Sequence, residues 1–239
     1  MLLTVREAAR LLDASDQQIY RWVDDGEIPC QSVRGQARFN RTHLLEWAIA
    51  RRLPISLSEF DAGLAVEDRA PSLARALRAG GVYHDVPAPD RESALRAVLE
   101  HTPLPPSLER DFVLAILLAR QGKNGRSPAI GGGIVIPHAR QPIVAPGANP
   151  ALSVSYLDRP VRLDDSALEP ATTVCLIVSP TVRAHLQMLA HLARALLQPS
   201  FRSAIARRAP TEPLAAEAER LEAVQYGTPP DPASWARAP

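Results

Sequence analysis

The residue with the clearest capacity for chemistry is His138, which follows a short apolar run. Ile134, Val135 and Ile136 favour a short buried strand, because β-branched side chains pack well on a pleated surface. Pro137 lacks a backbone donor and ends strand pairing directly before the histidine. A neutral imidazole near pH 7 is a good nucleophile and an adequate leaving group. The spacing therefore predicts a reactive histidine where a rigid strand opens into a loop.

Other sites that these residue types could form are weaker interpretations. The glycines at 131–133 allow a sharp turn and close approach to a ligand, but no Walker motif or dinucleotide fingerprint follows them. His185 and His191 are six residues apart on one expected helix, so they point in different directions, and no cysteine or carboxylate has ligand spacing beside them. We therefore expect no metal and no cofactor. A lone histidine is most often a surface or core residue, so the assignment of His138 depends on its surroundings.

Those surroundings have the pattern of an α/β domain. Residues 107–120 form an expected apolar helix that ends before the glycine turn. Residues 152–156 and 172–179 are strand candidates, and the second is continuously apolar, as expected of a central strand covered on both faces. Leucines at helical spacing predict a strongly apolar helix over 182–197, which places His185 near its start. Helix N-termini favour anions, so this end of the helix is suited to a phosphoryl group.

The run Ala-Ile-Gly-Gly-Gly-Ile-Val-Ile-Pro-His-Ala-Arg at 129–140 resembles the active-site segment of the phosphotransferase-system enzyme IIA family. The branch is the mannitol/fructose and nitrogen-regulatory type, and the resemblance extends over about 71–205. It implies an α/β fold, the enzyme IIA type-2 domain, with a mixed sheet flanked by helices. It also implies that His138 accepts a phosphoryl group from a phosphocarrier protein such as HPr. The protein would then be a phosphoryl carrier rather than a turnover enzyme.

The resemblance implies two further residues at the phosphoryl group. His185 matches the family's second active-site histidine and would hydrogen-bond the phosphoryl group or orient His138. Arg120 matches the family's arginine at the end of the preceding helix. The loop 121–128 departs from the pattern because it is about two residues longer, so Arg126 is an alternative to Arg120. Gly133 would support the phosphate through its backbone.

The N-terminal residues have the pattern of a winged helix-turn-helix. Thr4 with Glu7 and Ser15 with Gln18 are capping boxes that start two helices, and two short strands and a third helix follow. Residues 2–50 resemble the MerR-like/excisionase helix-turn-helix family. Through this resemblance, the expected DNA contacts come from the second helix and the wing, and they are Ser15, Gln17, Gln18, Arg21, Arg34 and Arg38. Glutamine can read adenine and arginine can hold phosphate.

The charge of this small unit leaves its role open. Residues 1–52 contain eight arginines and seven acids, so one copy should bind DNA weakly. Dimerisation or help from the second domain would be needed for tight binding. The alternatives are a helix-turn-helix kept as a protein-docking module, or an amphipathic helix pair without a binding role.

Composition gives the organisation of the chain. We expect a small N-terminal winged helix-turn-helix domain at 1–52, a linker at 53–70, the enzyme IIA type-2 domain at 71–208, and a Pro/Ala-rich disordered tail at 209–239 that includes a short helix. The formal net charge is +1, and only Lys123 is a lysine among the 27 basic residues. The N-terminus lacks an apolar signal-peptide core, and no window approaches the ~18 apolar residues of a membrane span. Two distant cysteines fit a reduced cytoplasmic setting, without membrane insertion.

Together these patterns predict a phosphotransferase-system-linked regulator that binds double-stranded DNA and responds to phosphorylation of His138 by a phosphocarrier protein. Two alternatives remain. One is a regulatory IIA protein acting on protein targets, with the helix-turn-helix as a docking module. The other is a phosphotransfer subunit for a separate sugar permease. The sequence leaves the oligomeric state open, a homodimer included.

Overall fold

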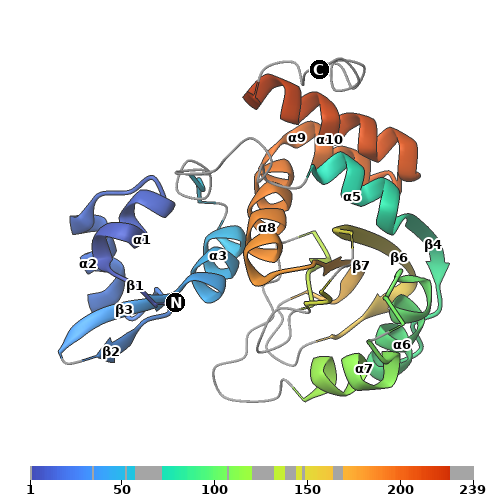
Figure 1. The fold of residues 1–239 in the computed structure, drawn as a ribbon, viewed down its shortest axis with the longest axis horizontal. Helices are drawn as coiled ribbons and strands as arrows, with labels where there is room; N and C mark the ends of the chain where they lie inside the picture. The colour runs from blue at the N-terminus through green and yellow to red at the C-terminus, as the bar shows by residue number, and fades with distance from the viewer. Residues whose placement is uncertain are drawn as a thin grey trace, which may run out of the picture.

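The computed structural model describes residues 2–33, 35–51, 53–56, 72–106, 108–119, 132–137, 144–146, 149–163 and 169–226. A small N-terminal unit and a larger α/β unit meet at one helix, α3, which lies beside the long helix α8 (Figure 1). Among the described residues, no helix has both the length and the apolar character needed to cross a lipid bilayer.

The N-terminal unit is a helix-turn-helix with a two-stranded wing. Its elements are β1 (Leu2–Leu3), α1 (Val5–Leu11), α2 (Asp16–Asp24), β2 (Gln31–Val33), β3 (Gln36–Asn40) and α3 (Arg41–Ala50). The strands form an antiparallel sheet in the order β1-β3-β2. Leu11, Ile19, Phe39, Leu44 and Leu45 are fully buried and form its core.

Local sequence signals set the helix boundaries in this unit. The Thr4–Glu7 capping box is present in both directions, since the Thr4 side chain accepts from the Glu7 backbone N–H and the Glu7 carboxylate accepts from the Thr4 backbone N–H at 2.7 Å. Ser15 caps α2 by accepting from the backbone N–H of Gln18 at 3.1 Å. Gly26 follows α2 with a φ of +67°, which suits a residue without a Cβ at a helix C-terminus.

The larger unit contains a mixed four-stranded sheet. Its strands are β4 (Val82–Val86), β5 (Ile134–Val135), β6 (Ala151–Val161) and β7 (Ala171–Val178), in the order β4-β6-β7-β5. β6 and β7 are antiparallel, whereas β4 runs parallel to β6 and β5 runs parallel to β7. This arrangement confirms the expected fold class, an α/β domain with a mixed sheet flanked by helices.

Two groups of helices cover the two faces of this sheet (Figure 1). On one face lie α5 (Leu73–Gly80), α8 (Val182–Leu197), α9 (Pro199–Ala206) and α10 (Thr211–Tyr226), and on the other lie α6 (Arg91–His101) and α7 (Arg110–Leu118). The helix expected over 107–120 is therefore shorter at its N-terminus, since α7 begins at Arg110 after Glu109.

Alternate residues of the two strands β5 and β7 face the two helix groups. Ile134, Cys175 and Ile177 belong to the core that contains α8, whereas Val135 and Val174 belong to the core that contains α6 and α7. Successive side chains of a strand point to opposite faces, so this division is what the pleat requires. It defines an α8 face of the sheet, to which Ile134 of β5 and Cys175 and Ile177 of β7 belong.

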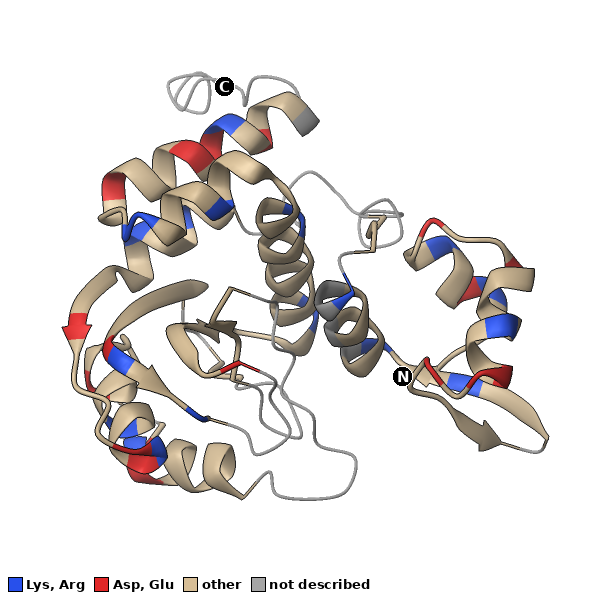
Figure 2. Ribbon diagram, turned by 180° about the vertical axis from the view of Figure 1, so that it is seen from behind, with Lys and Arg blue, Asp and Glu red and all other residues tan. Residues whose placement is uncertain are grey.

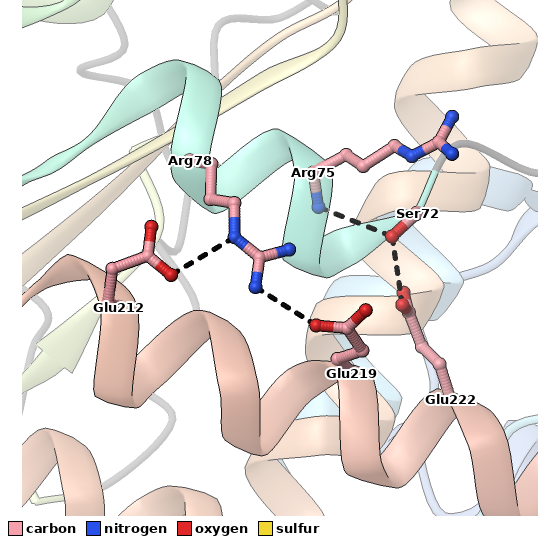
Figure 3. A network of polar contacts seen from close by, with 6 residues as sticks. All are labelled: Ser72, Arg75, Arg78, Glu212, Glu219 and Glu222. Carbon is pink, nitrogen blue, oxygen red and sulfur yellow. Dashed lines mark hydrogen bonds and ion pairs between the residues drawn. The ribbon is translucent and has the colours of Figure 1, made fainter. Parts of the chain in front are cut away.

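The first part of the tail, which was expected to be mostly disordered, is an ordered helix. Residues 211–226 form α10, and Glu212 and Glu219 of this helix both bind Arg78 of α5, at 3.2 and 2.9 Å (Figure 3). Ser72 caps α5 by accepting from the backbone N–H of Arg75, and Glu222 accepts from the Ser72 hydroxyl at 2.9 Å and from the backbone N–H of Leu73. The short helix expected at 214–224 is therefore present and longer than expected, and its partners on α5 lie far away in the sequence. Residues 227–239 of the expected tail lie outside the described residues.

Part of the expected linker belongs to the N-terminal unit. Ile55 is buried, and the backbone N–H of Ser56 donates to the carbonyl oxygen of Leu11 at 2.8 Å. The remaining linker residues, 57–70, lie outside the described residues. One continuous apolar core contains both Leu44, Leu45 and Ala48 of α3 and the buried residues of α8. The two units are thus joined by packing as well as by the chain.

Candidate functional site

The glycine turn sets the register of β5 against β7. Gly133 has a φ of +71°, and a Cβ added there would lie 2.5 Å from the Thr172 hydroxyl oxygen, so the position excludes any side chain. The Gly133 carbonyl oxygen accepts from the backbone N–H groups of Thr172 and Thr173, at 2.8 and 3.0 Å. The turn therefore anchors the first residue pair of the β5–β7 ladder, Ile134 with Thr173.

The strand β5 points toward the carboxyl end of β7. Ile136 is fully buried and Pro137 is half-buried, so the chain is held in the interior up to the residue before position 138. His138 itself, together with Arg120 and Arg126, lies outside the described residues. The register of β5 therefore fixes the point of the sheet from which the chain continues to His138, the predicted nucleophile.

The chain returns to the same end of the sheet after this segment. Val144 forms a parallel bridge with Ser179, and the backbone N–H of Ala145 donates to the Ser179 carbonyl oxygen at 2.9 Å. Ser179 directly follows β7. The segment that contains position 138 thus leaves β5 and rejoins the sheet beside the last residues of β7.

The helix α8 begins at Val182, three residues beyond Ser179. The Thr181 hydroxyl caps it by accepting from the backbone N–H of Ala184 at 3.1 Å, and the backbone N–H of His185 donates to the Thr181 carbonyl oxygen at 3.0 Å. The first backbone N–H groups of a helix have no partner within the helix, and the helix dipole favours negative charge there. The sheet end and the α8 N-terminus together make a place suited to an anion.

His185 lies in the first turns of α8 and is 4% exposed. Burial lowers the pKa of its imidazole to about 4, because the charged form loses its hydration. The ring is therefore neutral at physiological pH, and a neutral imidazole offers one N–H donor and one acceptor nitrogen. A neutral imidazole N–H can donate a hydrogen bond to a phosphoryl oxygen.

Sequence reasoning did not single out Ser179. Nothing in the local pattern marks this serine, because its place at the site depends on the Val144 bridge and on the register of β5 against β7. Gly133 and His185 were expected at the site. The structure places Gly133 directly before β5, beside the first residues of β7, and His185 near the start of the helix that follows β7.

Of the residues expected to contact DNA, some are exposed and others already make hydrogen bonds within the N-terminal unit. Gln17 and Arg21 are exposed on α2. Gln18 is half-buried, and Ser15 uses its hydroxyl oxygen to cap the helix. Arg38, on the wing, donates to the Gln36 side-chain oxygen at 2.6 Å and to the Ala37 carbonyl oxygen, so it is tied to its own strand. Arg34 lies outside the described residues.

Charges on this unit are mixed in sign. Figure 2 shows basic and acidic positions interspersed over the N-terminal unit rather than gathered on one face. Asp16, Asp24 and Asp25 are exposed on or beside α2, close in sequence to Arg21. Phosphate contacts supply much of the affinity for DNA, so this arrangement favours selective or assisted binding over strong non-specific binding.

Comparison with known proteins identifies both units. A family model described as "Phosphoenolpyruvate-dependent sugar phosphotransferase system, EIIA 2" matches residues 77–216, and a "Helix-turn-helix domain" model matches residues 2–52. The first match covers more than half of the chain, so the chain belongs to the EIIA 2 family of the phosphoenolpyruvate-dependent sugar phosphotransferase system.

Two solved structures are similar to this chain. The nitrogen regulatory protein IIA-Ntr from Neisseria meningitidis is 22% identical, with a TM-score of 0.49, over 61% of this chain and 98% of its own. The mannitol-specific cryptic phosphotransferase enzyme IIA CmtB from Escherichia coli is 14% identical, with a TM-score of 0.45, over 62% of this chain and 99% of its own. A search of the curated protein sequences finds no significant match.

Proposed function

We propose that this protein is a phosphotransferase-system-linked regulator in which a phosphocarrier protein phosphorylates His138 and the helix-turn-helix binds double-stranded DNA. The observation that carries the proposal is the meeting of β5, the Ser179 end of β7 and the α8 N-terminus at one edge of the sheet. Family membership supports the phosphoryl chemistry, and the match over residues 2–52 supports the DNA-binding part.

The transfer exchanges one phosphorus–nitrogen bond for another. The lone pair of a neutral His138 nitrogen attacks the phosphorus atom carried on a histidine of the donor protein. The phosphorus–nitrogen bond on the donor breaks, and its electron pair stays on the donor nitrogen. The donor ring, protonated on its other nitrogen, is released as a neutral imidazole, and His138 keeps its own N–H on the nitrogen that did not attack. The protein then carries the phosphoryl group, and the same exchange in reverse passes it on. Phosphoryl transfer of this kind depends mostly on positioning and on donors around the moving oxygens.

Three groups would hydrogen-bond or form ion pairs with the negatively charged phosphoryl oxygens. The N-terminal backbone of α8 supplies N–H donors, and the neutral His185 ring supplies one more. Arg120 or Arg126 would supply the positive charge, as the resemblance implies. A phosphoryl group adds about 1.5 to 2 negative charges at pH 7, so these donors would gain strength on phosphorylation.

The junction between α3 and α8 gives the phosphorylated site a route to the DNA-binding unit. α3 packs against α8, whose first turns carry His185, and α3 also belongs to the core of the helix-turn-helix. Added charge at the start of α8 would shift the packing of α3 and so the orientation of α2. The physical link is a contiguous apolar core rather than a flexible tether.

Two measurements test the proposal. The protein is incubated with a phosphorylated HPr-like carrier, and acid-labile phosphate is measured on wild type and on His138→Ala. Binding to promoter DNA fragments is measured for both phosphorylation states across a range of salt concentrations. We expect label on wild type only, and DNA binding that changes with phosphorylation. Label retained by His138→Ala would remove the site assignment.

A second function is favoured by one observation. The eight arginines and seven acids of residues 1–52, and their mixed placement, suit a protein-docking module as well as a DNA reader. In that case the chain would be a regulatory or transport IIA protein that acts on protein targets or a separate permease. Binding to a partner protein, with no binding to duplex DNA even at low salt, would support this function instead.

A further inference from the structure

We infer that Trp47 and Arg51, on α3 and directly after it, are positioning residues for the DNA-reading helix α2, which they hold through Trp22 and Glu27. The inference rests on the proposed function, because it assigns α2 to the DNA. It goes beyond that proposal by naming the contacts that attach α2 to α3, the helix that also packs against α8. These residues differ from those expected to contact DNA.

The first contact joins two tryptophans. The rings of Trp22 on α2 and Trp47 on α3 meet edge to face, with centroids 5.0 Å apart and an interplanar angle of 71°. Such pairs attract one another because a positive ring edge meets a negative ring face. Both side chains are half-buried and pack against the apolar core that α3 shares with α8. Trp22 directly follows Arg21, so this contact holds the part of α2 that carries an expected DNA-contacting side chain.

The second contact joins the C-terminal ends of the same two helices. The Arg51 guanidinium donates to the Glu27 carboxylate at 2.7 Å and lies over the Trp47 ring, 5.1 Å from its centroid. A cation over an aromatic face is attracted to the ring. Glu27 is attached to α2, since its backbone N–H donates to the Trp22 carbonyl oxygen at 2.9 Å. These residues therefore form a closed ring of contacts, the α2–α3 clasp.

The two ends of α2 are anchored on different partners. Near its N-terminal end, the backbone N–H of Ala14 donates to the Ala9 carbonyl oxygen at 2.9 Å, which ties the turn before α2 to α1. At its C-terminal end, the clasp ties α2 to α3. Because α3 also packs against α8, a shift of α3 against the larger unit is passed through the clasp to one end of α2.

The Glu27 carboxylate distinguishes a positioning role from a role of charge alone. A carboxylate repels the phosphates of DNA, so charge alone predicts that DNA binding becomes tighter when the carboxylate is removed. A positioning role predicts the reverse. Without the ion pair to Arg51, a larger share of the molecules would have α2 in another orientation, and the apparent affinity would fall with the competent share. The two roles therefore predict effects of opposite sign.

The test compares Glu27→Gln, Arg51→Gln and the variant that carries both changes. Glu92→Gln is the matched control, because it removes a carboxylate from an exposed ion pair with Arg96 on α6, in the larger unit. The probe is a DNA duplex that the wild-type protein selects from a random-sequence pool. Its dissociation constant is measured by fluorescence anisotropy at several salt concentrations, and thermal unfolding is measured for every variant.

We expect Glu27→Gln and Arg51→Gln each to weaken binding to the probe by about fivefold, the size of effect that one exposed ion pair supports. The variant with both changes should bind like either single variant, because both remove the same interaction. Glu27→Gln should keep the wild-type salt dependence, since it removes no phosphate contact. Glu92→Gln should bind like wild type. All variants should unfold close to the wild-type temperature, because exposed ion pairs contribute little to stability.

Binding by Glu27→Gln that is as tight as wild type or tighter would overturn the inference. A loss confined to Arg51→Gln, with a reduced salt dependence, would also overturn it, because Arg51 would then be a phosphate contact. Losses that multiply in the variant with both changes, or an equal loss in Glu92→Gln, would show that the effect does not come from the clasp. If the wild-type protein selects no duplex even at low salt, the proposed DNA-binding function fails, and the inference fails with it.

Discussion

His185 should make the stability of this protein depend on pH in a defined direction. Burial lowers the pKa of its imidazole from about 6.5 to about 4. Between these two values, the unfolded chain binds a proton at His185 that the folded protein excludes. Protonation thus favours the unfolded state, and the folded protein loses stability as the pH falls from about 6.5 to about 4. This contribution is fully present above pH 6.5.

The magnitude follows from the same two values. Each pH unit in this window corresponds to about 1.36 kcal/mol for one proton, so the loss attributable to His185 approaches about 3 kcal/mol. This loss is a large fraction of the unfolding free energy of a typical domain, which is about 5 to 15 kcal/mol.

The variant His185→Gln isolates the effect. Glutamine is polar and does not titrate, so the variant should lose about 3 kcal/mol less than wild type between pH 7 and pH 4. The unfolding free energy is measured by urea denaturation at several pH values, with His84→Gln as the control, since His84 is an exposed histidine. Parallel pH curves for wild type and His185→Gln would refute the reasoning. A flattened curve in His84→Gln would show that the effect does not come from the buried ring.

Three further predictions use other parts of the structure. Gly133→Ala should lower the free energy of unfolding, measured in urea, by about 2 kcal/mol or more, because a Cβ there meets Thr172 and the φ of +71° is unfavourable for alanine. Wild-type stability in this variant would contradict this interpretation of the turn. Arg21→Ala should weaken binding to promoter DNA and reduce its salt dependence, measured by fluorescence anisotropy; unchanged affinity and slope would remove α2 from the interface. Glu222→Ala should cost about 1 to 2 kcal/mol, since it leaves the Ser72 hydroxyl and the Leu73 backbone N–H without their acceptor, whereas Glu219→Ala removes an exposed ion pair and should cost less than about 1 kcal/mol. Equal costs would mean that the two hydrogen bonds to Glu222 have no special role.

Local signals predicted much of the fold. The Thr4–Glu7 capping box starts α1, and the leucine spacing predicted α8 over Val182–Leu197, which are its observed bounds. The continuous apolar run at 172–179 became the central strand β7. Each of these signals lies within one element, so the residues that encode it are neighbours in the sequence.

The elements that the sequence did not predict depend on distant partners. α5 begins at Leu73 after its Ser72 cap, and the Leu73 backbone N–H donates to Glu222, 149 residues away in the sequence. The edge strand β4 has half-exposed or exposed residues in most positions, so it lacks a clear apolar pattern. The short β1 pairs with β3 through only Leu2 and Leu3. Such elements are held by tertiary contacts rather than by their own propensity.

The residues of the candidate site also fall into those that a local motif predicts and those that only tertiary contacts bring to the site. The Ile-Pro-His run and the helix start at His185 could be identified from residue types, because each is a local motif. Ser179 could not, since only the bridge to Val144 brings it beside the segment that contains His138. The choice between Arg120 and Arg126 depends on residues outside the described part of the structure and stays a prediction.

The most direct test of the central claim is transfer of labelled phosphate from a phosphorylated HPr-like carrier to this protein, followed by mapping of the modified residue. We predict stoichiometric acid-labile phosphate on His138 in wild type and none on His138→Ala, with both proteins equally folded. Phosphate on another residue, or no label on wild type under conditions that label a known IIA protein, would contradict the account.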